Sequence, residues 1–381
     1  MTELETLYKK TQLGQGQFWT MFFEGDHFWT KHGKVDGKVV QTVPTYCKGK
    51  NEGKANATTD AEQAEKEARA KWTKKKDGGY VLSLDNIDED KDFYEPMLAH
   101  DYKKRKKLNK LTWPMLQQVK LDGMRCVARA SGLMSRNGKP ITSCRHVEKL
   151  LAPFFKNFPT AVVDGELYNH KFKDNFNKIL SLVRKLKPTD DQYKEIEKYV
   201  QFHIYDVPRI GDAVNEETPY SKRFKEGIKC IELSDPSDTD SALQYVSAVE
   251  VKDEAEMLSV YKQHIADGWE GSILRVDGPY QNKRSTNLLK YKDFMDAEFE
   301  VICVEEGTGN RAGMAGNIVL KLGDGTDRTF HSNVKGGFAF YKKLLKERKS
   351  VVGKMATIEF FELTPDGIPR FPYLKAIRDY E

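Results

Sequence analysis

Alternating and helical patterns occupy the first eighty residues. In GQFWTMFFEGDHFWTKHGKV (residues 16–35), aromatic and polar residues alternate around Gly-containing turns, which is typical of antiparallel strands. In TTDAEQAEKEARAKWTKKK (58–76), alanines and a tryptophan recur at helical spacing, and Thr59 or Asp60 can cap the helix. The sequence therefore predicts a small α+β module at residues 1–85.

Strands and helices alternate between about residues 112 and 294. Buried strands are indicated by the apolar runs in AVVDGELY (161–168) and QFHIYDV (201–207). Helical periodicity is present in SCRHVEKLLAPFFKNF (143–158) and DEAEMLSVYKQHIADG (253–268). This mixture favours an α+β or α/β domain.

The pattern changes to short strands from about residue 296. Gly and Asp turns separate AEFEVICVEEG, NIVLKLGDGT, DRTFHSNV and KMATIEFFELT, and one helical stretch, FAFYKKLLKERK, interrupts them. Short strands with one helix fit a small Greek-key barrel such as an OB-fold. We therefore predict a multidomain α+β protein with domains at residues 1–85, 90–294 and 296–381.

Two charged runs border the stretch YEPMLAH. They are the acidic DNIDEDKDF (85–93) and the basic KKRKKLNK (103–110), and we interpret this zone as a linker. The basic run is either a solvated loop or a nucleic-acid contact. The net charge of the whole chain is +5, which is compatible with a polyanionic partner but is shared by many proteins without one.

The N-terminus and the cysteines argue against several classes of protein. The first ten residues lack the pattern of a signal peptide, and no apolar run approaches the ~20 residues that span a bilayer. We therefore expect a soluble, intracellular protein that does not contact a membrane. The five cysteines form no CxxC pair, so neither a zinc ribbon nor a disulfide framework is supported.

A moderately specific motif follows an apolar run in QVKLDGMRCVA (118–128). Lys120, Asp122, Gly123 and Arg125 form KxDGxR, which chance would produce in under ~1% of chains of this length. A lone lysine beside an Asp-Gly turn is usually structural. A lysine that acts as a nucleophile is the alternative, and other motifs must decide between the two.

Further polar residues accompany the predicted strands. They are Arg136 in SRNGK, Glu166 in VVDGELY, Tyr205 in FHIYDV, Glu270 in DGWEGSILR, and Lys290 and Lys292 in LLKYK. Because residues two apart share one face of a strand, Lys290 and Lys292 should point into the same site. Two such lysines repel unless an anion such as a nucleotide phosphate lies between them. The alternative is a solvated edge strand that lysines protect from aggregation.

The ordered set resembles the nucleotidyltransferase motifs of ATP-dependent DNA ligases. The resemblance covers about residues 90–381 and points to the small bacteriophage-type enzymes, in which an adenylation domain of antiparallel sheets and helices precedes an OB domain. It implies ATP and Mg²⁺ or Mn²⁺ as cofactors, and nicked double-stranded DNA as the partner of a monomer. It also implies sealing between 3′-hydroxyl and 5′-phosphate ends through lysyl-AMP and DNA adenylate, in DNA repair, replication or recombination. A phage origin would place the enzyme in the cytoplasm of a bacterial host, and a nucleus or viral factory is the alternative.

The resemblance assigns the first motifs to the nucleotide and the nick. Lys120 would attack the ATP α-phosphate and hold AMP as a phosphoramide. Val119 and Arg125 would contact AMP, and Arg136 would bind ribose and phosphate. Asp122 would lie near the nick termini and contact DNA.

The later motifs supply carboxylates, an aromatic ring and cations. The resemblance implies that Glu166 contacts the ribose or the metal, and that Glu270 holds the divalent ion. Tyr205 would stack on adenine, and Lys290 and Lys292 would bind phosphates.

The chemistry needs these residue types. A lysine amine attacks only in its neutral form, and the ordinary pKa of lysine is ~10.4. Neighbouring cations favour the neutral amine and also stabilise charge on a transferring phosphoryl group. Carboxylates and phosphates are the ligands that Mg²⁺ prefers.

The C-terminal stretch PDGIPRFPYLKAIRDYE resembles the last ligase motif, whose basic residues orient the ATP β,γ-phosphates. Arg378 matches this motif best, and Arg370 and Lys375 are further candidates. Many relatives end in Arg-x-Asp-Lys, whereas this stretch reads IRDYE, so the lysine of that clamp is missing. A strand arginine without a role is the alternative for Arg378.

The N-terminal module resembles a WGR domain, a DNA-binding module named for a Trp-Gly-Arg turn. In this chain the turn would be His32-Gly33-Lys34. The resemblance implies DNA phosphate contacts from lysines on the strands and at the end of the helix. These lysines are Lys31, Lys34, Lys38, Lys74, Lys75 and Lys76. The alternative is a module that only packs against the ligase domain.

Other proteins share part of this set. An RNA ligase or an mRNA-capping guanylyltransferase uses the same lysine motif, and the latter also has an OB domain. NAD-dependent ligases share the lysine motif, but their usual zinc-finger cysteines are absent here. A DNA-end-binding protein with an inactive site is disfavoured because every expected charge is present.

Overall fold

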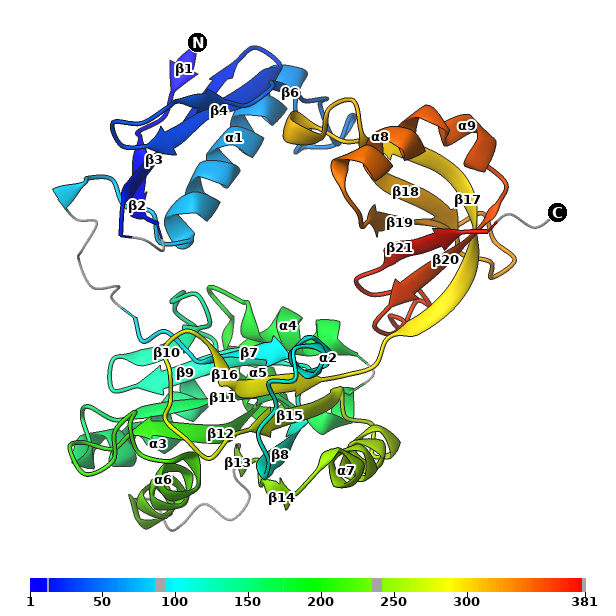
Figure 1. Ribbon diagram of the computed structural model, residues 1–381. Coiled ribbons are helices and arrows are strands. Elements are labelled where there is room, and N and C mark those ends of the chain that lie inside the picture. Colours follow the sequence, from blue (N-terminus) through cyan, green and yellow to red (C-terminus); the bar gives the residue numbers. More distant parts are fainter. Residues whose placement is uncertain (12–13, 86–92, 174, 235–241, 379–381) are drawn as a thin grey trace. The chain divides into compact units, whose positions relative to one another are not determined.

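The computed structural model describes residues 1–11, 14–85, 93–173, 175–234 and 242–378 (Figure 1). The mixed α+β fold is confirmed. The chain divides into two compact units, Asp92–Asp293 and a second one composed of Met1–Lys91 and Phe294–Glu381. The division into three domains stays a prediction. Within the described ranges, no helix has the length and apolar character needed to cross a membrane.

The N-terminal part is a six-stranded sheet with α1 (Asp60–Asp77) across one face (Figure 1). Thr59 and Glu62 form a capping box, in which each side chain accepts a hydrogen bond from the other residue's backbone N–H. The core between helix and sheet contains Leu7, Trp19, Met21, Phe23, Phe28, Cys47, Ala64 and Ala68. The strands are β1 (Thr2–Glu3), β2 (Leu7–Lys10), β3 (Gly16–Glu24), β4 (His27–Lys34), β5 (Val40–Gln41) and β6 (Thr45–Tyr46). The predicted antiparallel strands and helix are thus present.

The tripeptide that we expected to form a turn, His32-Gly33-Lys34, lies inside β4 instead. Gly33 pairs with Phe18 of β3, and the turn follows at residues 35–36. A Cβ atom on Gly33 would lie 2.5 Å from the Lys38 carbonyl oxygen, so the chain passes too close for any other residue. The resemblance to a WGR domain stays a prediction.

The unit Asp92–Asp293 contains two five-stranded sheets (Figure 1). We call them the β8 sheet, with the order β14-β8-β15-β16-β7, and the β9 sheet, with the order β10-β9-β11-β12-β13. Neighbouring strands are antiparallel, apart from β12 with β13 and β16 with β7. The predicted strands β11 and β12 and the predicted helices α3 and α7 are all present.

The bounds of these elements follow. The strands are β7 (Leu98–Asp101), β8 (Met115–Lys120), β9 (Met124–Arg129), β10 (Gly132–Ser135), β11 (Val162–Tyr168), β12 (Gln201–Arg209), β13 (Leu243–Tyr245), β14 (Val249–Val251), β15 (Gly271–Arg275) and β16 (Arg284–Tyr291). The helices are α2 (Tyr102–Lys107), α3 (Arg145–Asn157), α4 (Phe176–Val183), α5 (Asp190–Tyr199), α6 (Tyr220–Ser234) and α7 (Glu254–Ala266).

The predicted linker is wrong for the part that the structure describes. β7 pairs in parallel with β16, and the basic run forms α2, which Asp101 caps. Two of its lysines are held by carboxylates of the same unit, Lys103 by Asp293 at 2.7 Å and Lys106 by Glu254 at 2.6 Å. Residues 103–107 are therefore helical and not a loop, although the lysines of the run remain exposed. Most of the acidic run, residues 86–92, lies outside the described residues.

The C-terminal part is a closed barrel with the strand order β17-β18-β19-β21-β20, which confirms the OB-type fold (Figure 1). The sequence did not separate the fifth strand, β21, from its motif, and two helices replace the single one that we expected. The elements are β17 (Met295–Glu306), β18 (Ala315–Lys321), β19 (Thr329–Val334), α8 (Phe338–Lys346), α9 (Arg348–Val351), β20 (Met355–Phe360) and β21 (Tyr373–Ile377).

Candidate active site

A cavity of about 270 Å³ is lined by strands of both the β8 sheet and the β9 sheet. Its volume is close to the lower end for small-molecule sites, about 300 Å³. Seven predicted residues line it, namely Val119, Lys120, Arg125, Arg136, Glu166, Tyr205 and Lys290. The cavity also has walls that the sequence did not indicate, from Leu98 and Ala99 of β7 and from Arg275 and Arg284.

Lys120 ends β8, and its Nζ forms an ion pair with Glu270. Backbone pairing of Lys120 with Gly271 places the two side chains together. The Nζ of Lys292, the residue after β16, lies 2.8 Å from the other Glu270 carboxylate oxygen. Burial opposes ionisation of Glu270, but the two lysines outweigh it and lower the pKa of this carboxyl.

The glycine of the lysine motif is required by packing. A Cβ atom on Gly123 would lie 2.5 Å from the Leu167 carbonyl oxygen and 2.8 Å from Cγ of Glu166. The turn after Lys120 therefore passes directly against β11, the strand that carries Glu166. A larger residue here would push the lysine and the carboxylate apart.

Glu166 is the most perturbed acid of the cavity. Burial raises its pKa to about 8, and the negative charges of Glu270 and Asp164 act in the same direction. Arg125 and Lys120 act in the opposite direction without overcoming burial. The Tyr205 hydroxyl donates a long hydrogen bond of 3.4 Å to the carboxylate.

This perturbation predicts how stability depends on pH. Between pH 4.5 and about 8, Glu166 keeps its proton in the folded state and loses it in the unfolded state. Raising the pH through this window therefore lowers stability, and one proton contributes a slope of about 1.4 kcal/mol per pH unit. Glu166→Gln, which stays neutral, should flatten the fall of the calorimetric melting temperature across this window. An unchanged slope would contradict the raised pKa.

Arg125 is held by a residue that the sequence did not single out. Asp164, fully buried on β11, receives a two-point contact from Arg125, with Nε 2.9 Å from Oδ1. The guanidinium also lies 5.5 Å from the Tyr205 ring centroid. A charged pair with this fork geometry fixes the direction of the arginine as well as its charge.

The other cations of the cavity crowd one another. Burial lowers the pKa of Lys290, and Lys292 and Lys120 lower it further. Burial, together with Arg125 and Arg284, lowers the pKa of Arg136. Bringing like charges together costs free energy unless an anion joins them, so the cavity favours a ligand with several negative charges.

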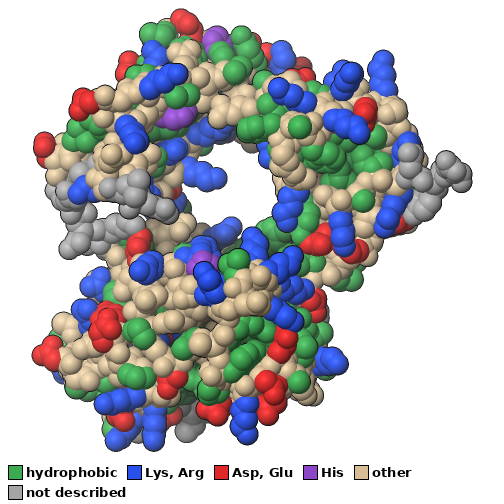
Figure 2. All heavy atoms as spheres, in the orientation of Figure 1, with side chains coloured by type: hydrophobic (Ala, Val, Ile, Leu, Met, Phe, Trp, Pro, Cys, Tyr) green, Lys and Arg blue, Asp and Glu red, His purple; other side chains and the backbone are tan. Residues whose placement is uncertain are grey.

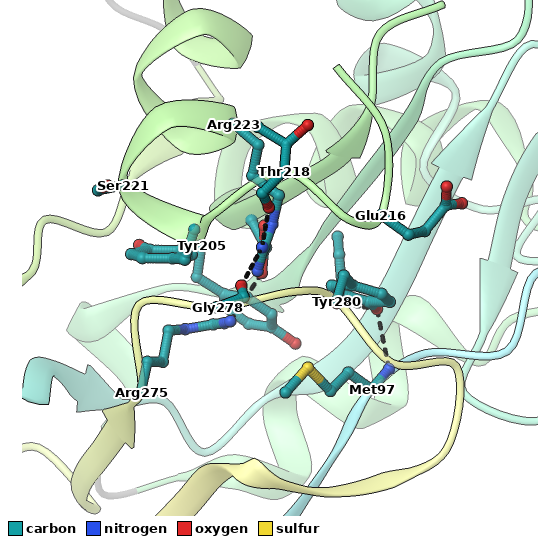
Figure 3. Close-up of polar contacts among 12 residues, drawn as sticks. Met97, Tyr205, Glu216, Thr218, Ser221, Arg223, Arg275, Gly278 and Tyr280 are labelled. Carbon is teal, nitrogen blue, oxygen red and sulfur yellow. Dashed lines mark hydrogen bonds and ion pairs between the residues drawn. The ribbon is translucent and has the colours of Figure 1, made fainter. Parts of the chain in front are cut away.

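A buried ionic network lies beside the cavity, and one of its members, Arg275, lines the cavity (Figure 3). Asp206 contacts Arg223 through both oxygens, at 2.7 and 2.8 Å, and Arg275 through one, at 2.7 Å. Arg275 also donates to Gln118 at 2.8 Å, next to Val119 and Lys120. We missed these residues because sequence patterns assign charged residues to the surface.

A second hollow of about 600 Å³ adjoins the first and shares Arg125, Arg136 and Glu166 with it. Further cations around it are Lys139, Arg184 and Lys185. In the view of Figure 2, Lys and Arg side chains also gather along the upper edge of the unit Asp92–Asp293, over the elements labelled β7 and α2 in Figure 1. Such a surface suits an extended polyanion.

Three predicted residues lie on the barrel, in the other compact unit. Arg378 donates to Glu298 at 2.9 Å, and Lys375 contacts Asp296 at 2.5 Å. Arg370 forms an ion pair with Glu362. Within its own unit, the barrel thus holds these cations with carboxylates.

Among the lysines expected to contact DNA, Lys34, Lys38, Lys74 and Lys76 are exposed. Three of the six lie over aromatic rings of the same module, where their stems cover apolar surface. These pairs are Lys31 over Phe22 at 4.9 Å, Lys75 over Trp19 at 5.2 Å and Tyr80 at 4.6 Å, and Lys76 over Trp72 at 5.0 Å. Asp122 lies in the turn after Lys120 and acts electrostatically on Lys292.

Two carboxylates of the site, Glu166 and Glu270, are candidates for holding a divalent ion. In the ranges that the structure describes, no cluster of three or more His, Cys, Asp or Glu side chains is arranged to hold a metal. Glu166 and Glu270 do act on each other across Lys120. One or two carboxylates completed by substrate phosphates are a usual set for Mg²⁺, so the residues fit this ion.

Comparisons with known proteins find DNA ligases. A family model described as ATP dependent DNA ligase domain matches residues 96–292, and one described as DNA ligase OB-like domain matches residues 306–378. The DNA ligase of African swine fever virus is 28% identical over 365 residues, which cover 89% of this chain and 81% of the viral one. The DNA ligase of Haemophilus influenzae is 26% identical over 276 residues, which cover 72% of this chain and 89% of the bacterial one.

Solved structures share the fold. A structure from a study of Lig E DNA ligases has a TM-score of 0.58 at 24% identity, and covers 74% of this chain and 99% of that chain. A structure described as Pmar-Lig_Pre has a TM-score of 0.63 at 24% identity, and covers 76% of this chain and 68% of that chain. The ligase-domain model matches more than half of the 381 residues. The chain therefore belongs to the family of ATP-dependent DNA ligases.

Proposed function

We propose that this ligase seals nicks in double-stranded DNA, joining a 3′-hydroxyl to a 5′-phosphate with ATP, and that Lys120 is its nucleophile. One observation carries the proposal. The Lys120 amine lies in a cavity whose other charged groups are mostly cations, and its counter-ion Glu270 is shared with Lys292. These cations would bind the negatively charged triphosphate of ATP next to the Lys120 amine.

In the first step, Nζ of Lys120 bonds to the α-phosphorus of ATP, the amine loses a proton, and pyrophosphate leaves. Before ATP binds, Glu270 holds this amine at the end of β8. Arg125 and Lys290 face the same cavity, where they would stabilise charge on the transferring group. AMP then moves to the 5′-phosphate of the nick, and the 3′-hydroxyl displaces AMP.

Glu166 and Glu270 are the residues that would hold Mg²⁺ or Mn²⁺. Bound there, the ion would neutralise phosphate charge. The roles of Arg136 at the ribose, of Arg378 in the ATP clamp and of Asp122 near the nick are further parts of this proposal, as is a monomeric enzyme. The second hollow, with its cations beside Arg125, supports a path for the strand that carries the 5′-phosphate.

Incubation with labelled ATP, GTP or NAD tests the reaction class. Radioactive label from the α-phosphate of ATP should become attached to the protein. Attachment of GMP would indicate a capping enzyme, and attachment from NAD would indicate the other ligase class. Sealing of nicked RNA in preference to nicked DNA would indicate an RNA ligase.

Tyr205 tests the orientation of the base. Stacking on a base is worth ~1–3 kcal/mol, so Tyr205→Ala should weaken ATP binding by roughly ten- to a hundredfold. Tyr205→Phe should bind nearly as well as the unchanged protein, because the bond from its hydroxyl to Glu166 is long, at 3.4 Å. Calorimetric titration with ATP measures both. Equal losses in the two variants would show that the hydroxyl, and not the ring, binds the nucleotide.

The exposed lysines of the N-terminal module test its contact with DNA. Replacing Lys34, Lys38 and Lys74 with alanine should flatten the slope of log affinity against log salt by about 3, at ~0.9 per phosphate contact. Affinity for nicked DNA should fall most at low salt, and the variant and the unchanged protein should converge as salt rises. AMP attachment should stay unchanged.

The control is a variant that loses the same number of charges from exposed helical lysines of the unit Asp92–Asp293. In it, alanine replaces Lys149, Lys222 and Lys262. It should keep the salt slope. If the N-terminal variant also keeps its slope and affinity, the module does not bind DNA.

A further inference from the structure

A loop of the β8 sheet is hydrogen-bonded to Asp164, the carboxylate that holds Arg125. The loop between β15 and β16, residues 276–283, carries Tyr280, whose hydroxyl donates to Asp164 of the β9 sheet at 2.7 Å. The same Asp164 oxygen, Oδ2, receives Nη2 of Arg125. Tyr280, Asp164 and Arg125 thus form a continuous relay that ends in the cavity.

The relay is buried and its proton positions are defined. Tyr280 is 3% exposed and Asp164 is fully buried. The backbone N–H of Met97 donates to the Tyr280 hydroxyl oxygen at 2.9 Å (Figure 3). Because this oxygen accepts from Met97, its single proton is available for Asp164. Burial raises the pKa of Tyr280, so the hydroxyl keeps that proton.

The loop that carries Tyr280 is fixed at several points. Arg223 donates to the carbonyl of Gly278 at 2.7 Å and to that of Thr218 at 2.8 Å, while its other nitrogens hold Asp206 (Figure 3). The backbone N–H of Tyr280 donates to Glu216 at 2.7 Å. The hydroxyl is therefore a fixed donor that restricts where the Asp164 carboxylate lies.

We propose that Tyr280 is a positioning residue, which sets the place of the Arg125 guanidinium through Asp164. Arg125 lines both hollows, and its side chain is 16% exposed, so a small rotation would withdraw it from one of them. The proposal rests on the proposed function of the cavity. It adds a link between the two sheets. The β8 sheet carries the nucleophile Lys120, and one of its loops also orients Arg125, a cation of the β9 sheet.

The experiment compares Tyr280→Phe with Tyr94→Phe in the full chain. Tyr94 is the matched control, because its ring packs 5.9 Å from that of Tyr280 and its hydroxyl bonds Glu216 rather than Asp164. In protein labelled with ¹⁵N-arginine, the Nε–Hε resonance that disappears in Arg125→Lys belongs to Arg125. Its exchange with solvent should be about tenfold faster in Tyr280→Phe and change by less than about twofold in Tyr94→Phe.

AMP attachment gives the second measurement. At saturating ATP, Tyr280→Phe should lower its rate by about tenfold and leave the KM for ATP within about twofold. In the Arg125→Lys background, Tyr280→Phe should have almost no further effect. If Arg125 exchange stays unchanged while the rate falls, Tyr280 acts elsewhere and the proposal is wrong. If neither measurement changes, it is equally wrong. If the unchanged protein attaches no AMP at all, the proposed function is contradicted. The exchange measurement would still show whether Tyr280 positions Arg125, because it does not depend on AMP attachment.

Discussion

Lys120→Ala should lose AMP attachment by more than about a thousandfold, because a methyl group cannot form the phosphoramide. Among the lining residues, Lys290 is the other amine, and it lies on β16, two strands away from the end of β8. The measurement is label transfer from α-labelled ATP to the full chain. Lys149→Ala, which removes an exposed lysine of α3, is the control and should label normally.

The same variant should still seal a nick that already carries AMP, since the last step does not use the lysine amine. Its rate on pre-adenylated DNA should stay within about tenfold of the unchanged protein, the difference reflecting the lost charge. If Lys120→Ala seals ordinary nicks with ATP, the nucleophile is another residue. If it fails on both substrates while its melting temperature is unchanged, Lys120 has a role in the last step as well.

Glu270→Gln should reduce both AMP attachment and sealing of pre-adenylated nicks, each by roughly a hundredfold. The neutral amide keeps the volume of the carboxylate but loses its charge. Lys120 and Lys292, which share this carboxylate, would then both lose its negative charge. A loss in both reactions would show that Glu270 serves several steps. A group that only orients the nucleophile would affect AMP attachment alone.

The matched control is Glu254→Gln, which removes a carboxylate paired with Lys106 outside the cavity. It should leave both reactions within about twofold of the unchanged protein. Raising the Mg²⁺ concentration should partly restore Glu270→Gln if the carboxylate binds the ion. Unchanged rates of Glu270→Gln at limiting Mg²⁺ would show that the ion is held elsewhere.

Elements with local signals were predictable from the sequence. The capping box at Thr59 and Glu62, and the apolar run of β11, depend on residues close together in the chain. The spacing of Lys290 and Lys292 predicted that both point the same way, because the period of a strand is two, and the two lysines do act on each other and on Lys120. The motifs also identified seven of the residues that line the cavity.

Features built from distant residues were not predictable in this way. β7 gave no signal as a wall of the cavity, because its parallel partner β16 lies more than 180 residues along the chain. Asp164 and Asp206 appeared within apolar runs, yet the arginines that compensate their charges come from other strands and helices. Composition could not show that Lys31, Lys75 and Lys76 lie over aromatic rings, because that depends on the packing of α1 and the sheet.

The buried acid that two arginines share, one of which lines the cavity, has an evolutionary consequence. Asp206, Arg223 and Arg275 are each no more than 3% exposed. Removing one member of such a set leaves a buried charge uncompensated, typically at ~3–5 kcal/mol, whereas exchanging the whole set for apolar residues of similar volume is often neutral. Every path that replaces them one at a time therefore crosses a fitness valley. Descendants of this gene should keep the triplet whole or lack it entirely, so its presence would serve as a marker of common ancestry among ligases whose overall identity has decayed.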